Sequence, residues 1–311
     1  MNRSVTIEDV LAKASEYLKK EKNLELIKEA YAFAKEKHEG QFRKSKDPYI
    51  QHPLEVAYML AELHASPTTI AAGFLHDVLE DTDVTKEELT EKFGEDVVKI
   101  VDGVTKIGKL KYLTKEKALA KTHQKILLAM ANDIRVVLVK LVDRVHNMRT
   151  LEYQTPEKQI KIAQETMDLY APLAHRFGMY RIKAELEDIA FRYLHPEEYD
   201  SLKQKISEQR SVREEDIAKM QQRIEELLKT NNITKYEIKG RIKNIYSVYK
   251  KMTQKNLAFD EIYDLMALRI LVPTVEQCYL VLGLVHGIWT PLPKRIKDYI
   301  AIPKPNLYQS L

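Results

Sequence analysis

The sequence predicts a mostly helical protein, with an all-helical region at residues 1–194 followed by a smaller α+β region at residues 233–311. Three observations support this prediction. Only 9 Gly and 11 Pro occur in 311 residues, and the strong helix formers Lys, Glu, Leu and Ala are abundant. Apolar residues recur at helical spacing through the first region. From Ile233 onwards, short apolar runs closed by Gly or Pro indicate strands as well.

The composition excludes several classes of protein. Hydrophobic residues make up 44% and charged residues 31%, as in a soluble globular chain rather than a disordered one. No apolar stretch approaches the ~18 residues that a membrane span needs, and the N-terminus lacks the apolar core of an export signal. Because Cys278 is the single cysteine, no intramolecular disulfide can form, and we expect a cytoplasmic protein. The net charge of +4 permits an anionic ligand but does not indicate nucleic-acid binding.

The first region is expected to contain a series of capped helices. Two helices precede a basic polar loop at residues 40–49. Pro53 then suits the first turn of another helix, which places His52 at the N-terminal edge of that helix. Lysine-rich residues 103–122 are expected to form a loop. Further helices are expected to begin at Pro67 and at Thr85, and to fill residues 156–194.

The segment from Ala71 to Thr82 places an adjacent His76-Asp77 pair inside an apolar run, and Glu80 and Asp81 follow. If the segment is helical, His76 shares a face with Glu80, and Asp77 shares a face with Asp81. A buried carboxylate is costly unless its charge is compensated, and a divalent cation is the simplest compensator. On its own, a His-Asp pair is more often a satisfied core histidine, so the rest of the chain decides.

The apolar segment 136–150 has two interpretations. Its β-branched residues could form a buried strand, which would divide the polar side chains between two faces. We favour a helix, because helical spacing gathers these side chains into one stripe of a buried element. The stripe consists of Val139, Asp143, His146, Asn147 and Thr150.

The rest of the chain contains a charged segment and the α+β region. Residues 195–232 are highly charged, with Leu and Ile at helical spacing, and we expect long exposed helices that bridge two domains. The elements expected after this bridge are strands at 236–243 and 265–272, helices at 244–251 and 275–286, and strands at 299–301 and 307–311.

Four residues in or beside apolar segments form a candidate metal site: His52, His76, Asp77 and Asp143. Two imidazoles and two carboxylates suit Mn, Fe or Zn better than Ca, and they leave coordination positions open for a substrate. Glu80 and Asp81 are placed to orient water or to shuttle protons. Arg43 and Lys44 could hold a polyphosphate at the mouth of the site. The order His, His-Asp, Asp resembles the HD superfamily of metal-dependent phosphohydrolases.

Further motifs sharpen this resemblance. They lie at residues 40–45, 49–53, 74–82, 102–106 and 141–150. Together they resemble the RelA/SpoT homologue family of the bifunctional Rel type, whose members make and degrade the alarmones ppGpp and pppGpp. The resemblance covers essentially the whole chain. Synthetase-only members of the family have lost the His-Asp pair, which this chain retains, so the resemblance implies an active hydrolase.

The resemblance implies roles for individual residues. It implies that Mn²⁺ is bound by His52, His76, Asp77 and Asp143. It also implies that Glu80 and Asp81 assist hydrolysis of the 3′-diphosphate, which gives GDP or GTP plus pyrophosphate. The residues that it implies for contact with the guanosine nucleotide are Arg43, Lys44, Ser45, Asn147 and Thr150.

A second group of motifs lies in the α+β region. Residues 240–251 place cations and a hydroxyl on a strand-to-helix unit, and Asp264 opens a buried strand where a carboxylate could bind Mg²⁺. These stretches resemble the family's synthetase domain, a nucleotidyltransferase-like fold that transfers pyrophosphate from ATP to the 3′-OH of GDP or GTP. By this resemblance Asp264 binds Mg²⁺, ATP is bound by Arg241, Lys243, Ser247 and Lys251, and the guanine nucleotide is bound by Lys297, Lys304, Asn306 and Tyr308.

The sequence departs from the family pattern at its end. It stops at Leu311, within an expected strand, whereas the family continues to a second essential carboxylate and to a regulatory half. Contacts with the ribosome and tRNA are expected only through that absent half. We therefore expect an incomplete synthetase domain, in a chain that hydrolyses the alarmone but does not synthesise it.

Two other functions stay open at this point. An HD hydrolase could act on another nucleotide, such as a dNTP or a cyclic nucleotide, although the second region speaks against this. A nucleotide-sensing module could instead bind alarmone at both sites and signal through residues 195–232. Turnover, as opposed to stoichiometric binding, separates the enzymes from the sensor. The sequence does not determine the oligomeric state.

Overall fold

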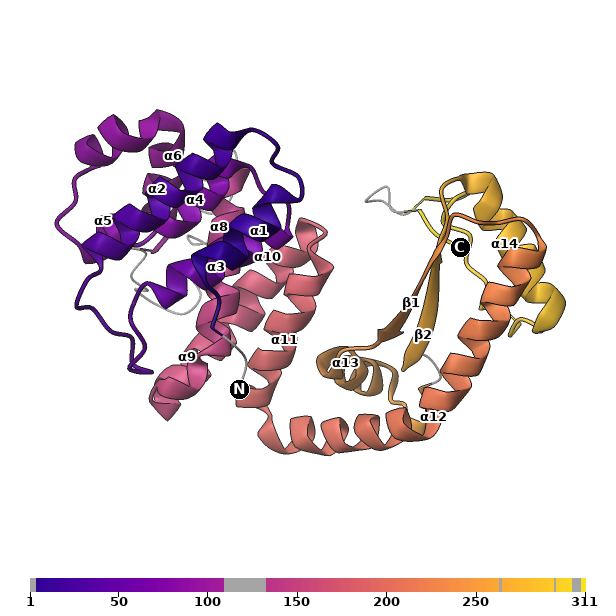
Figure 1. Ribbon diagram of the computed structural model, residues 1–311. Helices are drawn as coiled ribbons and strands as arrows, with labels where there is room; N and C mark the ends of the chain where they lie inside the picture. Colours follow the sequence, from indigo (N-terminus) through magenta and orange to yellow (C-terminus); the bar gives the residue numbers. More distant parts are fainter. Residues whose placement is uncertain (1–3, 109–132, 263–264, 294, 304–308) are drawn as a thin grey trace. The chain divides into compact units, whose positions relative to one another are not determined.

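The computed structural model describes residues 4–108, 133–262, 265–293, 295–303 and 309–311 (Figure 1). The chain divides into two compact units, Met1–Pro196 and Glu197–Leu311. Helices dominate the described part of both units, so the predicted mostly helical class is confirmed. No helix in these ranges is long and apolar enough to cross a lipid bilayer. The domain boundaries predicted at residues 194 and 232 stay predictions.

The described part of the first unit contains helices and no strand apart from an isolated bridge between Phe42 and Pro48. Helices α2, α3, α4, α6 and α8 pack around one apolar core. The helices are α1 (Ile7–Ser15), α2 (Glu21–Lys37), α3 (Gln51–Glu62), α4 (Pro67–Leu75), α5 (Val78–Asp81), α6 (Lys86–Gly108), α8 (Ile134–Arg149), α9 (Pro156–Glu165), α10 (Ala171–Arg176) and α11 (Tyr180–Leu194).

Side-chain caps fix where several of these helices begin. The Ser66 hydroxyl accepts the N–H of Thr69 ahead of α4, and the Thr85 hydroxyl accepts the N–H of Glu88 in α6. The Asp133 carboxylate caps α8 in the same way. Each such cap contributes about 1 kcal/mol, because it satisfies an N–H group that the helix leaves unpaired. The predicted helix starts at Pro67 and Thr85 are confirmed.

Helix α4 is the most buried element of the unit, and every residue from Thr69 to Leu75 is buried. A Cβ atom at Gly73 would lie 2.5 Å from Cδ1 of Leu60, which belongs to α3. Glycine therefore allows α3 and α4 to approach closely. His52 lies in the first turn of α3, and His76 directly follows the last residue of α4. The close approach of the two helices therefore helps to bring these histidines together.

Helix α4 ends before the carboxylates that were expected on it. The backbone of Asp77 has φ −99° and ψ −7°, and the separate helix α5 begins at Val78. The prediction of one continuous helix through Thr82 is therefore wrong. His76 and Val78 stay buried at this break, and the chain becomes exposed only at Glu80 and Asp81.

The segment with two interpretations is a helix, α8, as favoured. Its N-terminal turn lies against α6, where a Cβ at Gly103 would lie 2.6 Å from Cγ2 of Val136. Residues 103–108 continue α6, so the loop expected there is wrong as far as residue 108. Val101 and Val104 are buried at helical spacing, which extends the helix despite the lysines that follow. Residues 109–122 lie outside the described part.

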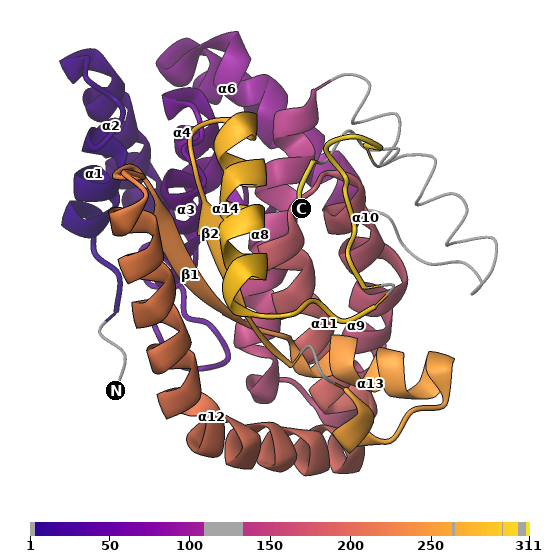
Figure 2. The ribbon, with the colours of Figure 1, turned by 90° about the vertical axis from the view of Figure 1, so that its right-hand side faces the viewer.

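In the described part of the second unit, helices α12 and α14 pack against a two-stranded sheet (Figure 2). Strands β1 (Glu237–Ile242) and β2 (Met266–Leu271) are antiparallel, with Glu237 opposite Leu271. Apolar side chains from β1, β2, α12 and α14 form a small core that includes Leu228 and Val281. The helices are α12 (Pro196–Thr230), α13 (Ile245–Lys255) and α14 (Val275–Ile288).

Most elements predicted for this unit are confirmed, but its last strands are not. Residues 299–301 form a turn, because the Asp298 carboxylate accepts the N–H groups of Ile300 and Ala301. No strand is assigned at 309–311, and residues 304–308 lie outside the described part.

Candidate functional site

The four predicted metal ligands converge from three elements of the first unit. The Nε2 atom of His52 lies 3.2 Å from Oδ1 of Asp143 and 3.6 Å from Oδ2 of Asp77. The Nε2 atom of His76 lies 3.2 Å from the same oxygen of Asp77 and 3.9 Å from Oδ1 of Asp143. Helix α3 carries His52, the α4–α5 junction carries His76 and Asp77, and α8 carries Asp143.

The orientation of the His76 ring is compatible with a cation among the four candidate ligands. Its Nδ1 lies 2.8 Å from the carbonyl oxygen of Gly73, which can only accept, so Nδ1 carries a proton. Its Nε2 is buried and makes no hydrogen bond to any residue described in the structure. Burial opposes a charged ring, but the Asp77 and Asp143 carboxylates raise the pKa of His76 to about 9. The two carboxylates thus need a positive charge between them, either a proton or a metal ion.

Asp143 is held in its ionised form by its neighbours on α8. The Lys140 amine lies 2.8 Å from Oδ2, and the Asn147 amide donates to Oδ1 at 2.5 Å. Burial would raise the pKa of Asp143, yet Lys140 and the two histidines lower it well below its usual value. Lys140 was not predicted as a site residue. The only signal for it was a lysine inside an apolar helical run, three residues before Asp143.

His52 has a second buried histidine behind it. Its Nδ1 lies 2.7 Å from Nδ1 of His146, which is also on α8. Burial lowers the pKa of His52. Burial, followed by the influence of the neighbouring His52 and Arg43 side chains, lowers the pKa of His146 to about 3, so this ring stays neutral. The sequence placed His146 on the polar stripe without giving it a role.

A tyrosine connects the metal site to one of the two predicted catalytic acids. The Tyr49 hydroxyl lies 2.7 Å from Oδ2 of Asp77 and 2.7 Å from Oδ2 of Asp81. Burial and both carboxylates raise the pKa of Tyr49, so its hydroxyl keeps its proton. Glu80 is exposed on α5, where it lines a hollow of about 600 Å³ with Asp81 and Asp83. The role of Tyr49 was not predicted.

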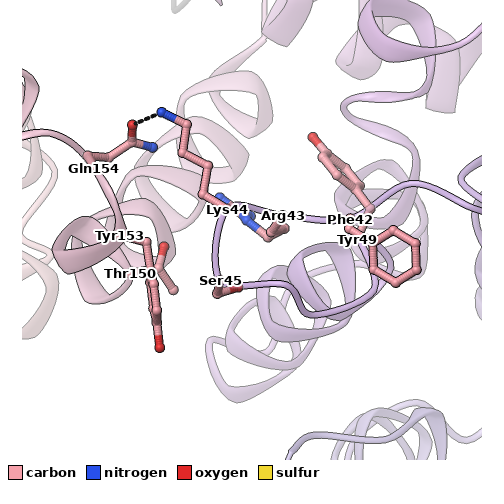
Figure 3. Close-up of a pocket in the computed structure, with 8 residues that line it drawn as sticks. All are labelled: Phe42, Arg43, Lys44, Ser45, Tyr49, Thr150, Tyr153 and Gln154. Atoms are coloured by element: carbon pink, nitrogen blue, oxygen red, sulfur yellow. Dashed lines mark hydrogen bonds between the residues drawn. The ribbon is translucent and has the colours of Figure 1, made fainter.

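A second hollow, of about 230 Å³, lies between the 42–49 loop and the end of α8 (Figure 3). The Arg43 side chain donates through Nη2 to Oδ1 of Asn147 at 2.8 Å, while its buried Nη1 has no hydrogen-bond partner within the described ranges. Lys44 donates to the side chain of Gln154 at 2.7 Å. The lining residues are Phe42, Arg43, Lys44, Ser45, Tyr49, Thr150, Tyr153 and Gln154.

This hollow gathers four of the five residues that were predicted to contact a nucleotide, and the fifth, Asn147, lies directly behind Arg43. A buried guanidinium donor without a partner is costly unless a ligand accepts its hydrogen bond, and phosphate oxygens suit it. The exposed aromatic rings of Phe42 and Tyr153 were missed. Their signal was only two aromatic residues in polar loops.

The second predicted site is described only in part. Ser247 and Lys251 are four residues apart on α13 and share a face. The backbone N–H of Lys243 donates to the carbonyl of Leu265 at 2.9 Å, which places it opposite the start of β2. Lys297 is exposed. Asp264, Lys304, Asn306 and Tyr308 lie outside the described residues, as does the side chain of Arg241.

Comparisons with known proteins give a consistent result. The family model "HD domain" matches residues 30–180, and "Region found in RelA / SpoT proteins" matches residues 240–311. The chain is 50% identical to a GTP pyrophosphokinase of Myxococcus xanthus, covering 93% of this chain and 38% of that protein. It is also 50% identical to a guanosine-3′,5′-bis(diphosphate) 3′-pyrophosphohydrolase of Aquifex aeolicus, covering 92% of this chain and 41% of that protein. A Spiroplasma citri protein of the same name is 44% identical, covering 100% of this chain and 42% of that protein. The chain thus spans about two fifths of the length of these relatives.

Proposed function

Because the chain belongs to the RelA/SpoT family, with an HD domain ahead of the RelA/SpoT region, we propose that its first unit hydrolyses the 3′-diphosphate of ppGpp and pppGpp. The products would be GDP or GTP and pyrophosphate. One observation supports this most strongly. The centre, in which His52, His76 and Asp143 are buried and Asp77 is partly exposed, is joined to the cationic hollow by a series of hydrogen bonds from Arg43 through Asn147 to Asp143. A ligand in the hollow would therefore have its phosphates next to the candidate metal ligands.

We propose Mn²⁺ for this centre, held by His52, His76, Asp77 and Asp143. When bound, the ion would act as a Lewis acid towards water and a phosphoryl oxygen. Lys140 and Asn147 hold the Asp143 carboxylate in place. The Tyr49 hydroxyl lies between Asp77 and Asp81 and donates its one proton to one of the two carboxylates at a time.

The residues of the chain also account for the proton transfers. Water adds to the phosphorus next to the ribose 3′-oxygen, the bond from phosphorus to that oxygen breaks, and pyrophosphate leaves. Asp81, an exposed carboxylate tied to the centre through Tyr49, can accept a proton from the attacking water. Glu80 is its neighbour on α5 and can return a proton to the 3′-oxygen.

The hollow supplies nucleotide contacts in this proposal. Arg43 and Lys44 would bind phosphate oxygens, since both place cationic donors in it. The rings of Phe42 and Tyr153 provide faces on which a base can stack. The Ser45 and Thr150 hydroxyls are left to contact the ribose or the base edge.

Pyrophosphate release from ppGpp tests the proposal. We expect turnover with Mn²⁺, none in metal-stripped protein, and none in Asp77→Ala. The control is Asp168→Ala, which removes an exposed carboxylate far along the sequence and should leave turnover unchanged. No turnover of ppGpp by the Mn²⁺-loaded protein would refute the proposal. A panel of dNTPs and cyclic nucleotides would then identify another hydrolase, and stoichiometric binding of ppGpp without turnover would identify a sensor.

For the second unit we propose binding of ATP and a guanine nucleotide with Mg²⁺ at Asp264. The shared face of Ser247 and Lys251 on α13 supports this, since it presents a hydroxyl and a cation to a phosphate chain. Calorimetric titration with ATP and Mg²⁺ tests it. Lys251→Ala should weaken binding, whereas Lys255→Ala, at the end of the same helix, should not. The single cysteine of the sequence fits a reducing cytoplasm, where we place the enzyme.

A further inference from the structure

Two buried histidines share one proton behind the metal site. The Nδ1 atoms of His52 and His146 are 2.7 Å apart, and the residues are only 2% and 8% exposed. A neutral imidazole carries one N–H and one unprotonated nitrogen, so a contact this short requires one ring to donate and the other to accept. Two arrangements satisfy the contact. They differ in whether Nε2 of His52, on the other side of the ring, carries a proton.

Only one arrangement leaves His52 able to bind a metal ion. If His52 donates from Nδ1, its Nε2 keeps a lone pair on the side of Asp143 Oδ1, 3.2 Å away, and Asp77 Oδ2, 3.6 Å away, so a cation is needed among these atoms. If His146 donates instead, neutral His52 must carry its proton on Nε2, where it blocks coordination. The metal-binding form of His52 therefore requires an acceptor at position 146.

The two histidine ligands differ in how this requirement is met. His76 faces the carbonyl oxygen of Gly73, which can only accept, so its Nδ1–H form is fixed by the backbone. Among the described residues, the partner of Nδ1 of His52 is instead the ring of His146, which can accept or donate. Asp143 and His146 are three residues apart on α8, so one helix supplies both a ligand and the partner of another ligand.

We propose that His146 is a positioning residue that accepts the Nδ1–H of His52 and thereby keeps Nε2 of His52 available to a divalent cation. This inference rests on the metal centre of the proposed function, but not on the identity of its substrate. Removing such a partner of a ligating histidine typically weakens metal affinity 10–100-fold.

The affinity of the full chain for Mn²⁺ in the absence of nucleotide tests the role of His146. This affinity can be measured from the EPR signal of the Mn²⁺ that remains free. We expect His146→Leu, which has no acceptor, to bind Mn²⁺ about 10–100-fold more weakly than the unaltered protein. His146→Asn should bind within a few-fold of it, because Oδ1 of asparagine takes roughly the place of Nδ1 and can accept. The control is Met148→Leu, a buried apolar replacement on the same helix.

Unchanged affinity in His146→Leu, or equal weakening in the Leu and Asn variants, would overturn the role of His146. If His146→Leu does not fold, histidine ¹⁵N spectra of the unaltered protein loaded with diamagnetic Zn²⁺ decide. They should show His146 with an unprotonated Nδ1, and a protonated Nδ1 there would overturn the proposal. Failure of the unaltered protein to bind Mn²⁺ would instead refute the metal centre and the proposed function.

Discussion

Replacing Lys140 with methionine removes a lysine that contacts Asp143. The Lys140 amine lies 2.8 Å from Oδ2 of Asp143, and the two side chains are 17% and 5% exposed. At an effective dielectric constant of about 20, two unit charges at this distance attract each other by roughly 6 kcal/mol. Much of this is offset by the cost of burying the lysine. Breaking a buried pair by removing one partner costs about 3–5 kcal/mol, and the partial exposure of Lys140 puts the estimate near 3 kcal/mol.

Urea unfolding of the metal-free protein at pH 7, followed by circular dichroism, measures this loss. The matched control is Lys106→Met, because Lys106 lies at the same 2.8 Å from Asp102 but is 72% exposed. Such a surface pair contributes about 0–1 kcal/mol. The reasoning is wrong if Lys140→Met loses no more stability than Lys106→Met.

The loss in Lys140→Met should also depend on pH. Lys140 helps to lower the pKa of Asp143 in the folded protein, against the effect of burial. A lowered carboxyl pKa stabilises the fold above the unfolded value of about 3.9, and this stabilisation disappears as the pH falls further. The difference in unfolding free energy between the unaltered protein and Lys140→Met should therefore be largest at pH 7 and decrease below pH 4. Excess Mn²⁺ should also reduce this difference in unfolding free energy, because the bound cation then compensates the charge of Asp143.

Three further variants test the catalytic acid, the nucleotide hollow and the helix contact. Tyr49→Phe removes the hydroxyl that joins Asp77 to Asp81, so kcat for ppGpp should fall at least tenfold with little change in KM. Arg43→Met removes a charged hydrogen-bond donor worth about 1.5–3 kcal/mol, so KM should rise by roughly 10- to 150-fold. Gly73→Ala places a Cβ 2.5 Å from Leu60, so urea unfolding should show a loss of about 1–3 kcal/mol; an unchanged midpoint would contradict the close packing of α3 on α4.

Local patterns were sufficient to predict most of the helices. Helical spacing and capping residues identified α4 from Pro67 and α6 from Thr85, and the stripe of polar residues identified α8 as a helix. The failures arose where local signals were overruled. Lysines after Gly103 indicated a loop, but buried valines continue the helix. At residues 299–301, the capping carboxylate of Asp298 forms a turn in a segment with strand-like composition.

For the candidate site, the sequence predicted the ligands but not all of the residues that support them. The residue types and their order identified His52, His76, Asp77 and Asp143, which the structure brings together. Several supporting contacts could not be predicted, because they join residues far apart in the sequence, unlike those of Lys140 and Asn147 with Asp143. His52 and His146 are 94 positions apart, and Tyr49 and Asp81 are 32 apart. Such pairs depend on how helices pack, which periodicity does not encode.

The amide of Asn147 has a consequence for how this enzyme can evolve. Its oxygen accepts from Arg43, and its nitrogen donates to Asp143. A flipped amide would turn a donor towards a guanidinium and an acceptor towards a carboxylate, so only one orientation is favourable. A substitution of Arg43 would release the amide oxygen of Asn147 and so also loosen the contact of this amide with Asp143, a proposed metal ligand. Under the proposed function, a change at the nucleotide contact of Arg43 is therefore expected to alter the metal site as well.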